Sequence, residues 1–300
     1  MNRHSFEGRV AIVTGAGRGI GRAHALLLAD RGARVVVNDL GGSIEGVGSD
    51  AAPASNVVAE IVAAGGAAIA NASDVADVAG AQALVDSAID RFGRLDVLVN
   101  NAGIVRWAGL PEADAANLAS TLAVHVAGSF NTTRAAWPRM VEQGYGRIVM
   151  TGSTGMFGLP SNLSYATAKA AVVGMTRSLT TAGAAHGIKI NVIAPAAFTR
   201  MAGSTPKGEI ESQMAPELVA PMVAFLAHED CPVSGEIYAA GAGRFARIFI
   251  AQTEGYVHST SEPTIEDVAE HWATINAETS YSVPDDLMQW SATFMKHLGS

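Results

Sequence analysis

Cysteine is almost absent from this sequence, since Cys231 is the only one among 300 residues. A single thiol excludes an internal disulfide, a dithiol redox motif and a metal centre built from cysteines. Basic residues are also in deficit: 20 lysines and arginines stand against 28 aspartates and glutamates, which leaves a net charge of −8. Nucleic acids and anionic membranes attract clustered cations, so we expect neither as a partner.

Long apolar runs are missing as well. No stretch reaches the roughly 18 apolar residues that would suggest a membrane-spanning helix. The first residues lead into a strand pattern without a secretory apolar segment. The final Leu298-Gly-Ser300 is not a peroxisomal targeting tripeptide. From these absences we expect a cytoplasmic protein that uses no metal.

Alternating strand and helix patterns fill most of the chain. Hydrophobic residues make up 49% of it, which indicates a large buried core. Short apolar runs predict strands at Val10–Val13, Arg34–Asp39, Ala67–Ala70, Leu95–Val99, Arg147–Thr151, Ile188–Ile193 and Glu236–Ala239. The clearest helical patterns are Val78–Phe92, Asn117–Trp137 and Leu163–Ala185. This alternation predicts an α/β fold with a doubly wound, mostly parallel seven-stranded sheet of the Rossmann type, whose ligands bind beyond the carboxyl ends of the strands.

A glycine-rich turn follows the first predicted strand. Gly15, Gly17, Gly19 and Gly21 precede a helical pattern that begins at Arg22. Glycines permit a tight strand-to-helix turn and a close backbone approach to a pyrophosphate, which then lies at the helix N-terminus. The spacing is G-x-x-x-G-x-G and differs from the more familiar G-x-G-x-x-G. A turn of this kind is weak evidence when taken alone, because the chain contains 32 glycines.

An acidic residue ends the second predicted strand. Asp39 lies about 20 residues beyond the glycines, where a carboxylate can accept hydrogen bonds from ribose hydroxyls and would repel a 2′-phosphate. Arg18 could favour NADP, but Leu40 supplies no second cation. The sequence therefore favours NAD as cofactor, with NADP as the alternative.

Tyr165 and Lys169 are four residues apart in a predicted helix, and Ser153 precedes Tyr165 by twelve residues. Residues at i and i+4 share one helix face. A nearby ammonium group stabilises a phenolate, so this pair suits proton transfer to or from an alcohol oxygen. Such a pair alone is usually a solvated surface feature. Its occurrence together with the glycine turn and Asp39, in this order, favours a catalytic site.

These motifs resemble the short-chain dehydrogenase/reductase family over roughly residues 6–245. The matching segments are Thr14–Gly21, Asp74-Val75, Asn100–Gly103, Ser153, Tyr165, Lys169 and Asn191–Pro195. Short segments such as Val35–Gly42 and Pro216–Pro221 are also similar to the dehydrogenase domain of peroxisomal multifunctional enzyme type 2 and to its 17β-hydroxysteroid dehydrogenase relatives.

The resemblance implies specific roles. Tyr165 would act as the proton acceptor, Lys169 would lower its pKa and bind the nicotinamide ribose, and Ser153 would orient the substrate oxygen. The implied NAD contacts are Gly15, Arg18, Gly19, Ile20, Gly21, Asp39, Asp74, Val75, Asn101, Ala102, Gly103, Tyr165, Lys169 and Pro195. Two features depart from the family pattern. Thirteen residues between the serine and the tyrosine are more common in the family, and His125 stands where the family usually carries asparagine.

The substrate is less well defined than the reaction. A (3R)-3-hydroxyacyl-CoA is the first choice, a 17β-hydroxysteroid or other bulky secondary alcohol the second, and a catalytically silent NAD-binding regulator a rival from another class. Phe198, Met201 and Met214 are candidate pocket walls in the unpatterned stretch 196–214. The candidate cations for binding CoA are Arg106, Arg200, Lys207, Arg244 and Arg247.

The sequence also suggests how the chain is divided. We expect a catalytic domain over residues 1–245 and a helical extension over 246–300 that packs on the same domain or on a neighbouring subunit. Thr264 with Asp267 predicts a capped helix in this extension. By resemblance to the family, the predicted helices Asn117–Trp137 and Leu163–Ala185 would mediate a homodimer or homotetramer.

Overall fold

The structure is a computed structural model and describes residues 4–202, 212–259 and 262–299. The chain divides into two compact units, residues 1–247 and residues 248–300. Each unit is described separately below.

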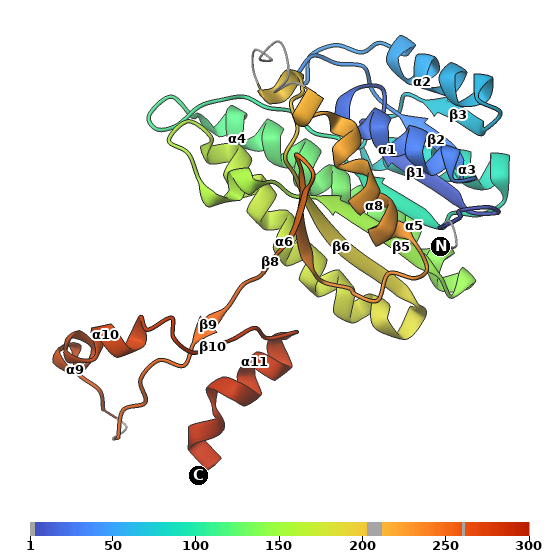
Figure 1. The fold of residues 1–300 in the computed structure, drawn as a ribbon. Coiled ribbons are helices and arrows are strands. Elements are labelled where there is room, and N and C mark those ends of the chain that lie inside the picture. Colours follow the sequence, from blue (N-terminus) through green and yellow to red (C-terminus); the bar gives the residue numbers. More distant parts are fainter. Residues whose placement is uncertain (1–3, 203–211, 260–261, 300) are drawn as a thin grey trace. The chain divides into compact units, whose positions relative to one another are not determined.

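The first unit is built on an eight-stranded sheet with the order β3-β2-β1-β4-β5-β6-β7-β8 (Figure 1). The strands are β1 (Val10–Thr14), β2 (Arg34–Asn38), β3 (Ala67–Asn71), β4 (Val97–Asn100), β5 (Gly146–Thr151), β6 (Ile188–Pro195), β7 (Ile237–Gly241) and β8 (Arg244–Ile248). All pairings from β3 to β7 are parallel. Each strand from β1 to β6 begins and ends within three residues of its predicted position, and the predicted doubly wound fold is confirmed.

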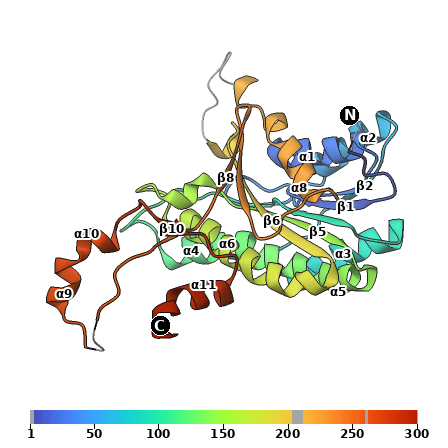
Figure 2. The same cartoon turned by 60° about the horizontal axis from the view of Figure 1, so that its bottom comes forward.

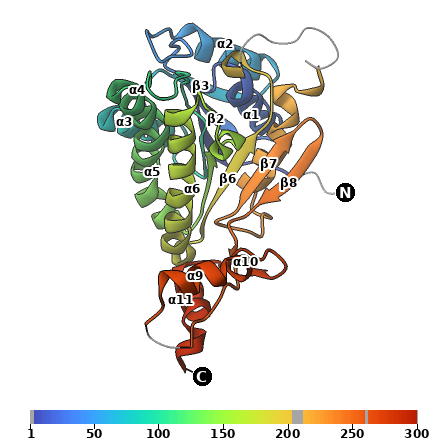
Figure 3. The same cartoon turned by 90° about the vertical axis from the view of Figure 1, so that its left-hand side faces the viewer.

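The predicted number of strands was wrong, because β8 was not foreseen. Ala242 and Gly243 have positive φ values of 50° and 72°, which is typical of a two-residue hairpin turn. The chain therefore folds straight back after β7 and adds an eighth strand at the edge of the sheet, as Figure 3 shows. A short turn of this kind gives little signal in sequence when its first residue is alanine.

Helices cover both faces of the sheet (Figure 2). On one face lie α1 (Gly19–Asp30), α2 (Ala52–Ala63) and α8 (Ala220–Ala227), and on the other lie α3 (Val78–Phe92), α4 (Ala115–Leu122), α5 (Ser129–Gln143) and α6 (Leu163–Gly183). Buried on both sides, the central strands consist almost entirely of apolar residues; in β4, Val97, Leu98 and Val99 have no exposed surface. No helix among the described residues is long and apolar enough to cross a membrane.

The predicted helix Asn117–Trp137 is not one regular helix. A π-helical turn, η1 (Ala123–Gly128), separates α4 from α5. A π-turn changes the hydrogen-bond register and often occurs at functional sites. Short 3-10 helices also occur after β5, α6 and β6 and before α8, namely η2 (Thr154–Phe157), η3 (Ala184–His186), η4 (Arg200–Ala202) and η5 (Pro216–Leu218).

The second unit has little core of its own. Its elements are β9 (Gln252–Thr253), α9 (Ile265–Glu270), α10 (Trp272–Ile275), β10 (Tyr281–Ser282), α11 (Leu287–Phe294) and η6 (Lys296–Gly299), and β9 pairs antiparallel with β10. Thr264 and Asp267 form the expected capping box at the start of α9. None of the side chains described in residues 248–298 is buried. Where this unit packs therefore stays a prediction.

Candidate active site

A cavity of about 740 Å³ opens at the carboxyl ends of the strands β1 to β6. Its walls contain all the predicted catalytic and cofactor-binding residues: Gly15, Arg18, Gly19, Ile20, Gly21, Asp39, Asp74, Val75, Asn101, Ala102, Gly103, Ser153, Tyr165, Lys169 and Pro195. Residues that follow six strand ends and residues of the helix α6 thus meet at one place, where the open α/β sheet is expected to bind a ligand.

The glycine turn between β1 and α1 is too crowded for side chains. A Cβ on Gly21 would collide with the carbonyl oxygen of Gly15, and a Cβ on Gly17 would lie 2.8 Å from Asp39 Oδ2. Gly15 and Gly19 have positive φ values of 61° and 53°, which glycine adopts without strain. The turn is therefore kept tight, and the N-terminus of α1 at Gly19 borders the cavity, as phosphate binding requires.

Asp39 is held beside this turn by backbone groups. The Gly17 N–H donates to Oδ2 and the Gly41 N–H donates to Oδ1, each at 2.7 Å. Two short hydrogen bonds of this kind fix the orientation of the carboxylate. Because Asp39 lines the cavity next to the glycine turn, a bound molecule at this end of the cavity meets a fixed negative charge.

Asn101 locks the loop after β4 onto the turn after β1. Its Nδ2 donates to the carbonyl oxygens of Thr14 at 2.9 Å and Gly15 at 3.1 Å. In return the Thr14 Oγ1 accepts hydrogen bonds from the backbone N–H groups of Asn101 and Ala102, both at 3.0 Å. Asn101 therefore braces the glycine turn, whatever contact it makes with a cofactor.

The three predicted catalytic residues converge on the cavity from β5 and α6. Lys169 is only 3% exposed, and its Nζ donates to the carbonyl oxygen of Thr151 at 2.7 Å. The same Nζ lies 5.6 Å from the centroid of the Tyr165 ring. Ser153 Oγ accepts the N–H of Gly155 at 2.9 Å, and a Cβ on Gly155 would lie only 3.0 Å from the Tyr165 ring. Gly155 therefore lets the Ser153 hydroxyl and the phenol ring share one wall.

Burial controls the ionisation of the pair. Burial lowers the pKa of Lys169 from 10.5 to about 7. Burial also raises the pKa of the Tyr165 phenol, and a hydrogen bond with Ser153 acts in the opposite direction. The net effect is a raised pKa of the Tyr165 phenol, because desolvation outweighs the hydrogen bond with Ser153. The lowering of this pKa by Lys169, which the family resemblance implies, stays a prediction.

His125 lies on η1 directly behind Tyr165. The two ring centroids are 5.4 Å apart in an edge-to-face arrangement, and His125 Nε2 lies 2.7 Å from the carbonyl oxygen of Ile104. Burial, with a smaller effect of the Lys169 charge, lowers the pKa of His125 to about 3. The ring is therefore uncharged at neutral pH and supports the phenol rather than protonating a substrate. The backbone carbonyl of His125 accepts a hydrogen bond from Ser129 Oγ at 2.8 Å.

Only one of the three predicted pocket walls lines the cavity. Met201 does so, whereas Phe198 and Met214 do not, and the backbone N–H of Phe198 donates to the carbonyl oxygen of Met214 at 2.8 Å. The lining also contains apolar side chains that sequence reasoning missed, namely Ile44, Ile104, Val105, Trp107 and Leu159. They come from the loops after β2, β4 and β5, and the Val105 N–H donates to the carbonyl oxygen of Ile44 at 2.8 Å.

The candidate cations for CoA binding do not gather at the cavity. Of the four that lie among the described residues, only Arg200 is part of the lining. Arg106 Nε donates to the carbonyl oxygen of Glu45 at 2.9 Å, and Arg247 forms an ion pair with Glu236 at 2.6 Å. Arg244 lies exposed on β8, and Lys207 lies outside the described residues.

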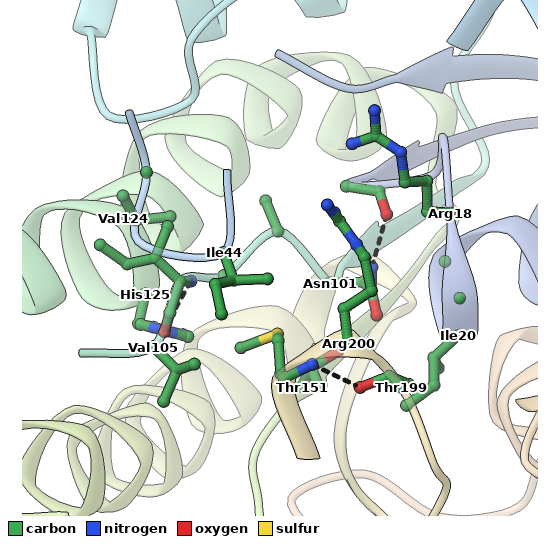
Figure 4. Close-up of a pocket in the computed structure, with 18 of the residues that line it drawn as sticks. Arg18, Ile20, Ile44, Asn101, Val105, Val124, His125, Thr151, Thr199 and Arg200 are labelled. Carbon is green, nitrogen blue, oxygen red and sulfur yellow. Dashed lines mark hydrogen bonds between the residues drawn. The ribbon is translucent and has the colours of Figure 1, made fainter. Parts of the chain in front are cut away.

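The cavity has two chemically different ends (Figure 4). Arg18 and Arg200 lie on one side of the view, and Ile44, Val105 and Val124 lie on the other, with His125 among them. Thr199, another lining residue that the sequence analysis missed, lies against the glycine turn: a Cβ on Gly19 would be 3.5 Å from its methyl group. The arginines beside the glycine turn suit the phosphates of a dinucleotide, and the apolar end suits the apolar part of a substrate.

A dinucleotide-type sheet, a phosphate-binding turn and a Tyr–Lys pair whose lysine is buried define, in one cavity, an oxidoreductase that acts on CH–OH groups. The comparison with known proteins gives its family. Residues 9–209 match the short chain dehydrogenase family, and the chain belongs to this family. The resemblance inferred from the motifs is therefore confirmed. Members of the family typically bind NAD or NADP.

Three proteins illustrate the kinship. The chain is 42% identical to a short-chain type dehydrogenase/reductase of Mycobacterium tuberculosis, over 90% of this chain and 94% of that protein. It is 40% identical to the peroxisomal multifunctional enzyme type 2 of Mus musculus, over 95% of this chain but only 39% of the mouse enzyme. Among solved structures, a 7α-hydroxysteroid dehydrogenase in complex with NADH and 7-oxo glycochenodeoxycholic acid gives a TM-score of 0.72 at 31% identity, over 81% of this chain and 98% of that one.

Proposed function

We propose that this protein catalyses the reversible oxidation of a secondary alcohol to a ketone with NAD, and that its substrate is a (3R)-3-hydroxyacyl-CoA. The observation that carries the proposal is the convergence of Ser153, Tyr165 and Lys169 in the cavity that also contains the glycine turn and Asp39. Proton transfer and dinucleotide binding can therefore take place in one cavity.

Each side chain has a distinct part in this proposal. Tyr165 takes the proton of the substrate hydroxyl through its phenol oxygen, and Ser153 Oγ orients the same substrate oxygen by a hydrogen bond. Lys169, with a pKa lowered to about 7 by burial, exchanges protons readily near neutral pH. Nicotinamide, when bound, supplies the hydride acceptor. The buried His125 ring packs edge-on against the phenol, and Gly155 leaves room for the phenol ring beside Ser153.

Asp39 supports NAD rather than NADP. A 2′-phosphate on the adenosine ribose would meet the carboxylate that Gly17 and Gly41 hold beside the turn. Arg18 and Arg200 also line the cavity and can attract phosphates. They do not distinguish the two cofactors, because either the diphosphate of NAD or the 2′-phosphate of NADP would be attracted. The fixed charge of Asp39 decides our choice of NAD.

The acyl-CoA substrate rests on kinship with multifunctional enzyme type 2, and the alternative rests on a different observation. The apolar end of the cavity, with Val105, Trp107 and Leu159, could equally hold the ring system of a steroid. The structural similarity to a 7α-hydroxysteroid dehydrogenase favours this second candidate. A silent NAD-binding regulator is disfavoured because all three catalytic residues are present.

A substrate panel tests the proposal. We would supply NAD and measure NADH formation with (3R)- and (3S)-3-hydroxyacyl-CoAs and with 7α- and 17β-hydroxysteroids. Turnover of the (3R)-acyl-CoA in preference to its (3S)-isomer would support the proposed substrate. Turnover of steroids alone would support the proposed reaction but would show that the substrate is a steroid and not an acyl-CoA. Binding of NADH without turnover of any secondary alcohol would favour the regulator. The cytoplasmic location and the homodimer or homotetramer stay predictions alongside this proposal.

A further inference from the structure

Two histidines and an aspartate meet on the surface of the first unit, away from the cavity. His4 lies in the segment before β1, and His228 and Asp230 follow the last residue of α8. His228 Nδ1 is 3.4 Å from Asp230 Oδ2, and His4 Nε2 is 3.9 Å from the same oxygen. One ligand atom from each of the three residues lies within 4.8 Å of the other two. They are the one such group of histidine, cysteine, aspartate or glutamate ligands among the described residues.

The surroundings of His228 orient its ring for metal binding. The residue is only 5% exposed, and Phe6 packs edge-on against the ring with centroids 5.2 Å apart. Its Nε2 is 3.1 Å from the carbonyl oxygen of Ser5, so that Nε2–H donates there and Nδ1 keeps its lone pair. A histidine ligand commonly donates its second ring N–H to a carbonyl group in this way, which fixes the tautomer. The lone pair of Nδ1 faces Asp230, whose backbone N–H donates to it at 3.1 Å.

The cluster and the catalytic cavity lie at opposite ends of β5. Arg147, near the amino end of that strand, donates from Nε to the carbonyl oxygen of His228 at 3.3 Å. Ser153 follows the carboxyl end, and six extended residues span about 20 Å. A metal ion bound by the cluster would therefore not reach the reacting atoms. It would tie the segment before β1 to the connection between α8 and β7.

We propose that His4, His228 and Asp230 bind one Zn²⁺ ion at a surface site away from the cavity. Two imidazoles and one carboxylate form a donor set that suits zinc, and water would complete a tetrahedron. Ligand atoms around tetrahedral Zn²⁺ are about 3.3 Å apart, given metal–ligand bonds of about 2.0 Å. The 3.4 Å separation between His228 Nδ1 and Asp230 Oδ2 already matches this value. His4 Nε2 lies 3.9 Å from Asp230 Oδ2, and the exposed His4 side chain would move to close this distance. His228 Nδ1 would give up its hydrogen bond from the Asp230 N–H and bind the metal instead.

Zinc titration of the untagged full-length protein tests the site. We expect the wild-type protein to bind one equivalent of Zn²⁺ in isothermal titration calorimetry. His4→Ala and Asp230→Ala remove ligands whose side chains are 49% and 65% exposed, so that both variants should fold. Each should bind Zn²⁺ at least about tenfold more weakly. The matched control is His258→Ala, because His258 also lies beside a carboxylate, 3.5 Å from Asp267 Oδ2, but outside the cluster.

A second readout follows the structural consequence. Zn²⁺ should raise the thermal midpoint of the wild-type protein and of His258→Ala, and should leave that of His4→Ala unchanged, because only an intact site stabilises the folded state. Co²⁺ serves as a spectroscopic probe of the same site. Its visible absorption should appear with the wild-type protein and with His258→Ala, and should be lost with His4→Ala and Asp230→Ala. Equal Zn²⁺ affinity of wild type and His4→Ala, or no binding by the wild type, would overturn the proposal.

Discussion

Acid should destabilise this protein through two buried histidines. His24 on α1 and His125 on η1 are 1% and 2% exposed. Burial lowers the pKa of each ring to about 3, from 6.5 in an exposed peptide. Neither nitrogen of His24 has a hydrogen-bond partner among the described residues. The folded protein therefore keeps both rings neutral at pH values where the unfolded chain protonates them.

The sign and size of the effect follow from linkage. A ring with a lowered pKa in the folded state has no effect on stability above about pH 6.5 and costs progressively more as the pH falls toward 3. Between about pH 7.5 and about pH 5, each ring should lower the free energy of unfolding by about 2 kcal/mol, and the two together by about 4 kcal/mol. This is a large part of the typical stability of a domain, about 5–15 kcal/mol.

Urea unfolding of the wild type and of His24→Leu at about pH 7.5 and about pH 5 isolates the contribution of the His24 ring to the acid-induced loss of stability. Leucine fills a similar volume and leaves no partner unsatisfied, since the His24 nitrogens have none among the described residues. The acid-induced loss in the variant should be smaller than in the wild type by about 2 kcal/mol. His186→Leu, at an exposed histidine, is the control and should behave like the wild type. Equal losses in wild type and His24→Leu would refute the reasoning.

Three further perturbations address the cavity. Lys169→Met should lower kcat by about 100-fold or more, because the site loses the buried amine that exchanges protons near neutral pH beside the phenol. Steady-state kinetics measure this effect. Gly21→Ala should weaken NADH binding at least about tenfold in a fluorescence titration, because the new Cβ meets the carbonyl oxygen of Gly15; unchanged affinity would contradict the geometry of the turn. Asp39→Ser should shift the ratio of kcat/KM values toward NADP by at least about tenfold, because one fixed negative charge is removed. A variant that still prefers NAD by the wild-type margin would show that another residue selects the cofactor.

The strands and the phosphate turn could be predicted from sequence because local patterns determine them. Val10–Val13 and Arg34–Asp39 are short segments rich in β-branched residues, and the helix Val78–Phe92 has the same bounds in the structure as in the prediction. The positions of the Tyr165–Lys169 pair and of Asp39 then follow from the rule that ligands lie at the carboxyl ends of parallel strands. These residues do line one cavity.

The remaining features depend on contacts between distant segments. The apolar wall formed by Ile44 and Val105 exists because the loops after β2 and β4 hydrogen-bond to each other. The π-turn at His125 replaces an expected regular helix, and burial in the fold, which no local pattern reports, sets the pKa values of Tyr165 and Lys169. The pairing of His4 with His228 also appears only once the chain is folded.

The most direct test of the central claim is the turnover of Tyr165→Phe with NAD and a secondary alcohol that the wild-type enzyme oxidises. We predict that NADH binds this variant with nearly wild-type affinity and that kcat falls by about 100-fold or more, because the fold is kept but the proton acceptor is lost. Tyr238→Phe, on β7 and outside the cavity lining, should keep full activity. Wild-type turnover by Tyr165→Phe would contradict the account of this site.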